Sequence, residues 1–285
     1  MKKMSFLLVL LSVCSLVGTT PTQQASKKAV IFDVGCVLVE PAKLVAFKIA
    51  GSQNFFWYFA ANLAMVSGAA EKIRCHHLYP FLRNCMPYDQ ASCPMYDEFN
   101  QCMPQIMVEW MTGRMSCSLI RAICKEKTSI YSSWFANQAE RDLMHAMTAM
   151  MFTPEVLVLT QKFIPKSVDF VRQCKKEGYK VYILSNWDPE SFPLLVQKDP
   201  AFFDLFDGIV VSGNCGYVKP DRQIYKYLLA TYQLEPNNCF FIDDVIQNVQ
   251  AARASGITAA QCADCNIDTI KPAFEAWRKA SPLLL

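Results

Sequence analysis

Five short apolar segments that end at polar residues lie along the chain, and they constrain its fold more than any other feature. Their β-branched and aromatic residues are typical of buried strands. The segments that we expect to form strands are 29–32, 179–184, 206–211, 239–242 and 257–260. Segments with the helical spacing of apolar residues lie between the later ones, at 165–178, 221–234 and 245–255. Strands that alternate with helices predict an α/β fold built on a doubly wound parallel sheet.

Several of these segments end at side chains that carry chemistry. Asp33 follows the first segment, Ser185 follows the second, and Asp243 and Asp244 follow the fourth. In parallel sheets of this kind, functional groups gather at the carboxyl ends of the strands. We therefore expect one pocket to collect these residues.

The region between the first two expected strands does not follow this alternation. Residues 42–160 are rich in Met, Cys and aromatic residues and show helical spacing without strands. We interpret them as an inserted, mainly α-helical cap, and residues 27–41 and 161–285 as the core domain. Closure of such a cap would exclude water from the site and supply contacts to a substrate.

One uncharged stretch of the cap has the composition of a membrane-contacting helix. Residues 49–70 carry no charge and include aromatic residues at every position from 55 to 59. Residues 51–54, with the sequence Gly-Ser-Gln-Asn, interrupt the stretch, which favours a buried cap helix or an aromatic pocket wall over a helix lying on a membrane. Apart from the N-terminus, membrane contact is not expected.

The N-terminus has the pattern of a signal peptide. Lys2 and Lys3 precede an uncharged apolar run at 4–17, which is shorter than the roughly 20 residues that cross a bilayer. A small polar segment follows at 18–20. We expect residues 1–20 to direct export to the periplasm or out of the cell. An uncleaved anchor, an apolar extension and a lipoprotein signal ending at Cys14 are the alternatives.

Cysteine usage agrees with export. The chain has 13 cysteines, and six of them fall within the cap: Cys75, Cys85, Cys93, Cys102, Cys117 and Cys124. In an exported protein such a cluster indicates disulfides. A set of buried thiols is the alternative, because cysteine is often buried as a small apolar residue.

Composition limits the kind of partner. Hydrophobic residues make up 52% of the chain and charged residues 19%, which is enough for a packed core. The formal net charge of +3 is too small to favour binding to nucleic acid.

The polar strand ends belong to four segments that resemble, in order, the four signatures of the haloacid dehalogenase superfamily. They are 31–38 with Asp33, 183–186 with Ser185, 216–220 with Lys219, and 240–244 followed by Asn248. The likeness covers 29–38 and about 165–262, and does not extend to the cap. It implies the Rossmann-like core of that superfamily with a helical cap inserted after the first motif.

The resemblance implies a role for each residue that meets the substrate. Asp33 would attack phosphorus and form an aspartyl-phosphate, which divides one difficult step into two. Lys219 would neutralise charge on the nucleophile and on the transferred group. Ser185, Asn186 and Lys219 would bind the phosphate oxygens.

The resemblance also implies a metal site. Mg²⁺ would be held by Asp33, by the backbone carbonyl of Gly35 and by Asp244, with Asp243 beside it. Asn248 would reach a water molecule bound to the ion. Oxygen ligands from few protein groups are what Mg²⁺ prefers.

The chain departs from the pattern at Gly35, where family phosphatases carry a second Asp that protonates the leaving oxygen. Such an acid is worth roughly 10²–10⁴ in rate. Without it we expect a Mg²⁺-dependent phosphohydrolase acting on a small phosphorylated metabolite with a good leaving group. A catalytically idle binding protein and a haloacid dehalogenase, which needs no acid but usually has Tyr here, are the alternatives. Cys36, in place of a commoner Gly, is assigned to packing.

Overall fold

The structure, a computed structural model, describes residues 28–62, 73–87, 94–97 and 99–280. The expected signal peptide at 1–20 lies outside these residues. So do Cys14, Cys93 and part of the uncharged stretch at 49–70.

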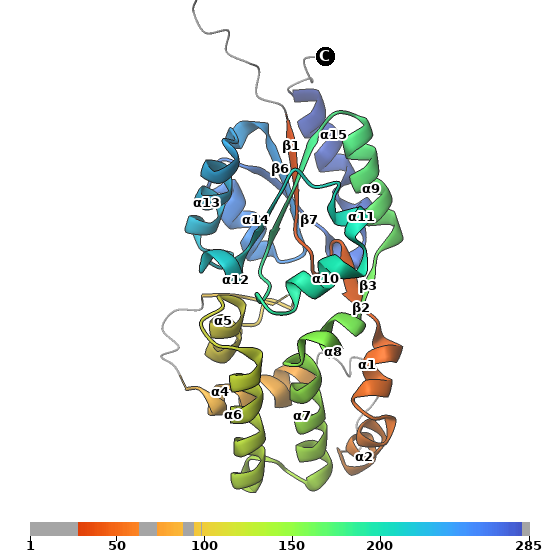
Figure 1. The fold of residues 1–285 in the computed structure, drawn as a ribbon, viewed down its shortest axis with the longest axis vertical. Coiled ribbons are helices and arrows are strands. Elements are labelled where there is room, and N and C mark those ends of the chain that lie inside the picture. Colours follow the sequence, from red (N-terminus) through yellow and green to blue (C-terminus); the bar gives the residue numbers. More distant parts are fainter. Residues whose placement is uncertain (1–27, 63–72, 88–93, 98, 281–285) are drawn as a thin grey trace, which may run out of the picture.

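A parallel sheet of five strands forms the centre of the core domain (Figure 1). The strands are β1 (Ala29–Phe32), β4 (Lys180–Ser185), β5 (Gly208–Val211), β6 (Cys239–Asp243) and β7 (Thr258–Gln261). Their order in the sheet is β5-β4-β1-β6-β7, and every neighbouring pair is parallel. The predicted α/β fold class is confirmed, with strand boundaries displaced by one or two residues.

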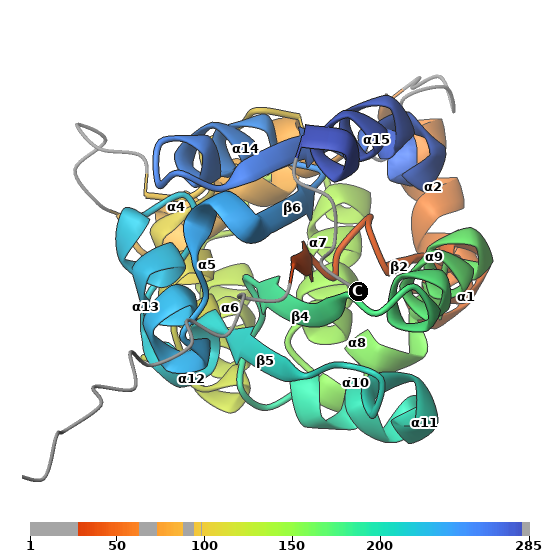
Figure 2. The ribbon, with the colours of Figure 1, turned by 90° about the horizontal axis from the view of Figure 1, so that it is seen from above.

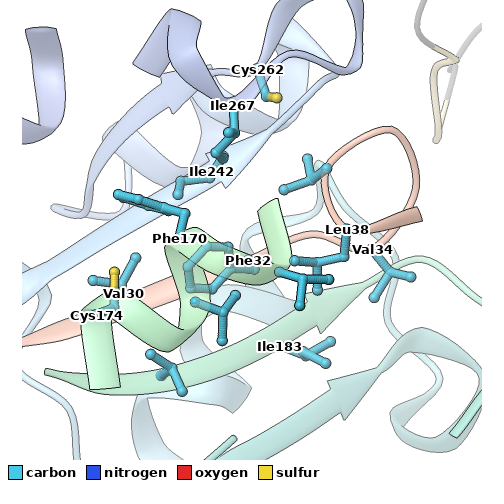
Figure 3. Close-up of a cluster of buried hydrophobic side chains, with 14 of the residues drawn as sticks. Val30, Phe32, Val34, Leu38, Phe170, Cys174, Ile183, Ile242, Cys262 and Ile267 are labelled. Atoms are coloured by element: carbon cyan, nitrogen blue, oxygen red, sulfur yellow. The ribbon is translucent and has the colours of Figure 1, made fainter. Parts of the chain in front are cut away.

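Helices cover both faces of this sheet (Figure 2). Those that pack on it are α9 (Pro165–Lys176) and α15 (Lys271–Ala280) on one face, and α13 (Arg222–Tyr232) and α14 (Ile246–Arg253) on the other. Val30 and Phe32 of β1 face the first pair, where Phe32 packs beside Phe170 of α9 (Figure 3). Ala29 and Ile31 face the second pair. Because both faces are buried, the strands have continuous apolar sequences instead of alternating ones.

The edge strand β5 begins at a glycine for a packing reason. A Cβ atom at Gly208 would lie 2.2 Å from the ring of Tyr232 in α13. The Tyr232 hydroxyl accepts a hydrogen bond of 2.9 Å from the Ile209 backbone N–H. The aromatic ring therefore occupies the space that a side chain would need.

Two short antiparallel strands connect the core to the inserted segment. They are β2 (Val39–Pro41) and β3 (Gln161–Phe163). Just beyond them the Ala42 backbone N–H donates to the Thr160 carbonyl at 2.7 Å. The chain thus leaves the core and returns to it at one place.

The segment between these strands is helical in its described part. Its α-helices are α1 (Lys43–Ile49), α2 (Ser52–Asn62), α4 (Tyr79–Cys85), α5 (Gln105–Met111), α6 (Cys117–Ile130), α7 (Gln138–Met151) and α8 (Pro154–Leu159). They gather around a separate apolar core that includes Leu82, Ile106, Trp110, Ile120 and Leu143. This helical layer lies against the end of the sheet (Figure 1).

The uncharged stretch is only partly buried. Tyr58 belongs to the cap core, whereas Phe56 and Trp57 are 63% and 61% exposed. None of these three lines the cavity described below, so the described part of the stretch, 49–62, does not form the aromatic pocket wall that was one of the two expectations. No helix in the described part of the chain is both long and apolar enough to span a bilayer.

The core domain also contains short helices that the sequence pattern did not predict. They are α10 (Phe192–Lys198), α11 (Pro200–Phe203) and α12 (Ser212–Cys215). All three are too short to show a clear helical period. Phe192, Phe202 and Phe203 nevertheless pack into the core beside the sheet.

The cap cysteines have different environments. Cys102 is disulfide-bonded. A hydrogen bond with the Cys85 thiol, together with burial, raises the pKa of Cys124. Burial raises the pKa of Cys117 to about 12, and its sulfur accepts a hydrogen bond from Trp110 Nε1. The predicted disulfide network of the whole cluster stays a prediction.

Candidate active site

The carboxyl ends of the central strands face the helical layer and place the expected residues at one edge (Figure 1). Asp33 directly follows β1, and its backbone N–H donates to the Ile242 carbonyl of β6 at 2.8 Å. Ser185 is the last residue of β4, and Asp243 is the last residue of β6. Sheet topology alone therefore brings together residues that are more than a hundred positions apart.

Lys219 links the two carboxylates. Its Nζ donates to Asp33 Oδ1 at 2.6 Å, to Asp243 Oδ2 at 2.6 Å and to the Leu184 carbonyl at 3.0 Å. The side chain is 1% exposed. All three protons of the ammonium group are used, so this buried charge is fully compensated.

Burial and charge act in opposite directions on these groups. Burial raises the pKa of Asp33 to about 6, although the Lys219 ammonium lowers it. Burial alone would lower the pKa of Lys219, but the Asp243 and Asp33 carboxylates outweigh it, and the pKa is raised. Lys219 therefore stays a cation, and Asp33 ionises within the neutral range.

The loop that carries Lys219 is held by Asn186. The Asn186 side chain accepts from the Lys219 N–H at 2.8 Å and donates to the Lys219 carbonyl at 2.9 Å. This pair of bonds gives Asn186 a positioning role. Asn186 also lines the cavity, and its expected role in substrate binding remains a prediction.

Three carboxylates converge where a metal was expected. One oxygen each from Asp33, Asp243 and Asp244 lies within 4.8 Å of the others. Asp243 is already engaged, because its Oδ1 accepts from the Val245 N–H at 2.8 Å and from the Asn248 amide at 3.0 Å. Its other oxygen bonds Lys219. The geometry therefore favours Asp33 and Asp244 as ligands, with Asp243 as an orienting group.

Two buried polar atoms at this edge have no hydrogen-bond partner among the described residues. They are Ser185 Oγ and Asn248 Oδ1. Buried polar atoms in folded proteins are nearly always paired, so each of these needs a ligand or a water molecule. Together with the oxygen-rich carboxylate group, they fit a hydrated divalent cation and a phosphate.

A cavity of about 280 Å³ lies between this edge and the cap. Asp33, Gly35, Lys219, Asp244 and Asn248 line its core side. Among the described residues, Ser185 and Asp243 are not part of the lining, since both are buried behind it. The predicted site residues thus divide into those that meet the cavity and those that support them.

Gly35 and Cys36, which follow Asp33 and Val34, differ in backbone conformation. Gly35 does not have a positive φ, and among the described residues a Cβ atom there would meet only Asp33 Oδ2, at 3.8 Å. Cys36 has a φ of +52°, in the left-handed region that favours glycine. A side chain would therefore fit at position 35, where the sequence has glycine. At position 36 the sequence has cysteine in a backbone conformation that glycine would adopt without strain.

Similar proteins agree with this geometry. Residues 131–256 match the family profile of haloacid dehalogenase-like hydrolases. An enolase-phosphatase of Shewanella frigidimarina is 30% identical over 185 residues, covering 61% of this chain and 78% of that protein. The chain belongs to the haloacid dehalogenase-like hydrolase family. The resemblance inferred from the four motifs is therefore confirmed.

Other relatives of this haloacid dehalogenase-like hydrolase match over shorter segments. A sesquiterpene phosphatase of Aspergillus oryzae is 31% identical over 99 residues, 35% of this chain and 50% of that protein. The bifunctional epoxide hydrolase 2 of Rattus norvegicus is 35% identical over 86 residues, 29% of this chain and 16% of that protein. The chain thus spans half or less of these two proteins. A solved family enzyme from Bacteroides thetaiotaomicron overlays with a TM-score of 0.49 at 17% identity, over 83% of this chain and 93% of that one.

Sequence patterns missed two buried acids of this hydrolase that line the cavity, Asp188 and Asp97. Asp188 lines the cavity, and burial raises its pKa. It stands three positions after Ser185, a spacing that could have drawn attention to it. The cap docks beside it, because Glu190 Oε1 accepts from the Cys117 N–H at 2.6 Å. A second link runs from Ser212 Oγ to the Met111 carbonyl at 2.5 Å.

Proposed function

We propose that this chain is a Mg²⁺-dependent phosphomonoesterase that forms an aspartyl-phosphate at Asp33. The observation that carries the proposal is the placement of Asp33 on the cavity floor, buried and held 2.6 Å from the Lys219 ammonium. The named phosphatases among its relatives support the same chemistry.

In the first half-reaction an Asp33 oxygen attacks phosphorus and the ester P–O bond breaks. The leaving oxygen takes a proton from water, since Gly35 offers no side-chain acid. Lys219 neutralises negative charge on Asp33 and on the phosphoryl group during the transfer. The unpaired Ser185 hydroxyl and nearby N–H groups would bind phosphate oxygens once the substrate enters.

In the second half-reaction water attacks phosphorus of the aspartyl-phosphate. The bond between phosphorus and the Asp33 oxygen breaks, so that inorganic phosphate leaves and the carboxylate is restored. Asn186 keeps Lys219 in place through both steps. The cap limits the access of bulk water to the intermediate.

The charge of the site fits a divalent cation. Asp33, Asp243 and Asp244 contribute three negative charges and Lys219 one positive charge, which leaves two negative charges to be balanced when all are ionised. Asp33, Asp244 and the Gly35 carbonyl would hold Mg²⁺, which would reduce the repulsion between the carboxylate and the phosphate.

The test is phosphate release from p-nitrophenyl phosphate by the wild type and by Asp33→Asn. We expect a loss of at least 10³-fold in the variant, because the amide is not a nucleophile. EDTA should silence the wild type, and Mg²⁺ should restore it. Asp169→Asn, a change at an exposed ion pair with Arg172, is the matched control and should keep full activity.

Two results would contradict the proposal. One is Asp33→Asn activity above a few per cent of wild type with an intact circular dichroism spectrum. The other is halide release from 2-chloropropionate without phosphate release, which would identify a dehalogenase. Failure to release either product would point to an idle, ligand-binding member of the family.

A further inference from the structure

We propose that the alcohol part of the substrate is apolar, so that the site hydrolyses phosphate monoesters of alkyl or aryl alcohols in preference to sugar phosphates. The inference rests on the proposed phosphatase function. It concerns the cap side of the cavity, which the four motifs do not include. The reaction is the one given above: the ester P–O bond breaks, and the alcohol leaves with a proton from water.

Thioether and aromatic side chains form most of the cap wall of the cavity. They are Met95, Tyr96, Met103, Met107, Trp110, Met111 and Met151. Methionine is unbranched and polarisable, and adapts to apolar ligands of irregular shape. An apolar group gains burial against the methionines, whereas a substrate hydroxyl finds only a weak hydrogen-bond acceptor in a thioether sulfur.

Asp188, a carboxylate that lines the cavity from the loop between β4 and α10, is engaged within the protein. Its Oδ1 accepts the backbone N–H groups of Glu190 at 3.0 Å and Ser191 at 2.9 Å. Its Oδ2 accepts the Ser191 hydroxyl. Asp188 therefore fixes the start of α10 and is not a ready acceptor for substrate hydroxyls.

Asp97, the second carboxylate, is engaged in the same way. Its Oδ1 accepts the N–H groups of Phe99 at 3.0 Å and Gln101 at 2.8 Å, and its Oδ2 accepts the Tyr79 hydroxyl at 3.0 Å. Asp97 thus holds a turn of the cap. A sugar would bury hydroxyls against methionines, where each loses its water partners without an equal replacement, and this weakens binding.

The size of the cavity limits the apolar group. Its volume of about 280 Å³ is near the lower end of the range for small-molecule sites. A single ring or a short alkyl chain beside the phosphate suits this space. We therefore expect kcat/KM to rise with the length of the alkyl group of the substrate and then to level off.

The test compares ethyl, butyl, hexyl and octyl phosphate, each below its micelle-forming concentration, with glucose 6-phosphate. The alkyl esters share a primary-alcohol leaving group, so chain length changes burial but hardly changes leaving ability. One fully buried methylene is worth about fourfold in affinity. We expect kcat/KM to rise at least tenfold from ethyl to hexyl phosphate, with glucose 6-phosphate no better than ethyl phosphate.

Two methionine variants test the wall itself. Met111→Gln and Met151→Gln change partly buried cavity residues to a polar residue of similar length. We expect each to lower the hexyl-to-ethyl ratio of kcat/KM by at least threefold. Met147→Gln is the matched control, because Met147 lies one turn before Met151 on α7, is also partly buried, and packs into the cap core without lining the cavity.

Binding of alkylphosphonates, which the reaction cannot cleave, separates this inference from the proposed function. Calorimetry should show affinity rising from ethyl- to hexylphosphonate. If that happens while no ester releases phosphate, the proposed function fails and the apolar preference stands. If phosphate is released but neither kcat/KM nor affinity rises with chain length, or if Met147→Gln lowers the ratio as much as the cavity variants, the inference is overturned.

Discussion

Gly35 and Cys36 show how single residues set the limits of this site. Gly35 removes the side chain that would protonate a leaving group, and Cys36 holds a left-handed conformation that glycine adopts without strain. The Cys36 carbonyl accepts from the Cys262 thiol, so packing assists in holding this turn. The loop after Asp33 thus lacks a side-chain acid at Gly35, and the contact between Cys36 and Cys262 helps to hold its conformation.

Gly35→Asp should restore a general acid. The position has no positive φ, and its Cβ would stand 3.8 Å from Asp33 Oδ2, so the side chain fits beside the nucleophile. We expect turnover of alkyl phosphates to rise by at least tenfold, toward the roughly 10²–10⁴ that a positioned acid supplies. Aryl phosphates, which leave readily without a proton, should gain much less.

The measurement is the ratio of kcat/KM for hexyl phosphate to that for p-nitrophenyl phosphate in the wild type and the variant. Thermal melting of both proteins controls for folding. Comparable rates on the two esters in the wild type would mean that another group already donates the proton. In that case our account of Gly35 would be wrong.

At the scale of secondary structure, Asp207 ties three elements of the core domain. Its carboxylate pairs with Lys175 of α9 at 2.8 Å and with Lys180 of β4 at 2.7 Å. It also accepts the Val181 N–H at 2.9 Å, while its own N–H donates to the Val181 carbonyl. Although burial opposes it, these hydrogen bonds hold the pKa of Asp207 below its ordinary value.

Asp207→Asn should therefore destabilise the fold in a pH-dependent way. A carboxyl whose pKa is lowered by folding stabilises the native state above its unfolded pKa, and this contribution is lost as pH falls through the folded pKa. We expect a loss of about 1–2 kcal/mol at pH 7 that shrinks below pH 4. Urea unfolding across this pH range measures it. Asp169→Asn is the control, since its exposed pair with Arg172 should contribute little at any pH. A pH-independent loss would exclude the ion pairs as its cause.

At the scale of the whole molecule, one end of the core sheet carries the candidate active site, and the start of β1 and the end of α15 lie at the other (Figure 1). Lys28, just before β1, donates to the Trp277 carbonyl of α15 at 2.9 Å, and its ammonium lies 4.1 Å from the Trp277 ring centre. The start of the sheet is thus fastened to the last described helix. The helical cap and its cysteines lie at the opposite, functional end.

We propose that the chain is exported and that its cap is stabilised by disulfides. The basic and apolar pattern at 1–20 and the cysteine density at 75–124 motivate the proposal. Mass spectrometry of protein recovered from an oxidising compartment, under non-reducing conditions, should show a shortened N-terminus and fewer than six alkylatable cap thiols. Recovery of the full-length chain with all six thiols reduced would count against both parts.

The sequence by itself determined the core sheet and the residues at its carboxyl edge. Both depend on local signals, because a buried parallel strand has a continuous apolar sequence and the residue after it must lie at the carboxyl edge of the sheet. For this reason the order of residues alone was enough to place Asp33 and Asp243 at one edge of the sheet. Lys219 was recognised by its motif, but its double ion pair depends on how the strands assemble.

Only the tertiary structure decided what faces the substrate. The cavity methionines, from Met95 to Met151, also belong to or pack against the cap core, and no sequence period distinguishes them from core methionines that do not reach the cavity. Met147 and Met151 lie one turn apart on α7 and both pack against the cap core, but Met151 also lines the cavity and Met147 does not. Which of two apolar side chains meets a cavity depends on how helices pack across long stretches of sequence. The family and the core fold could therefore be predicted from local motifs, whereas the shape and polarity of the cavity could not.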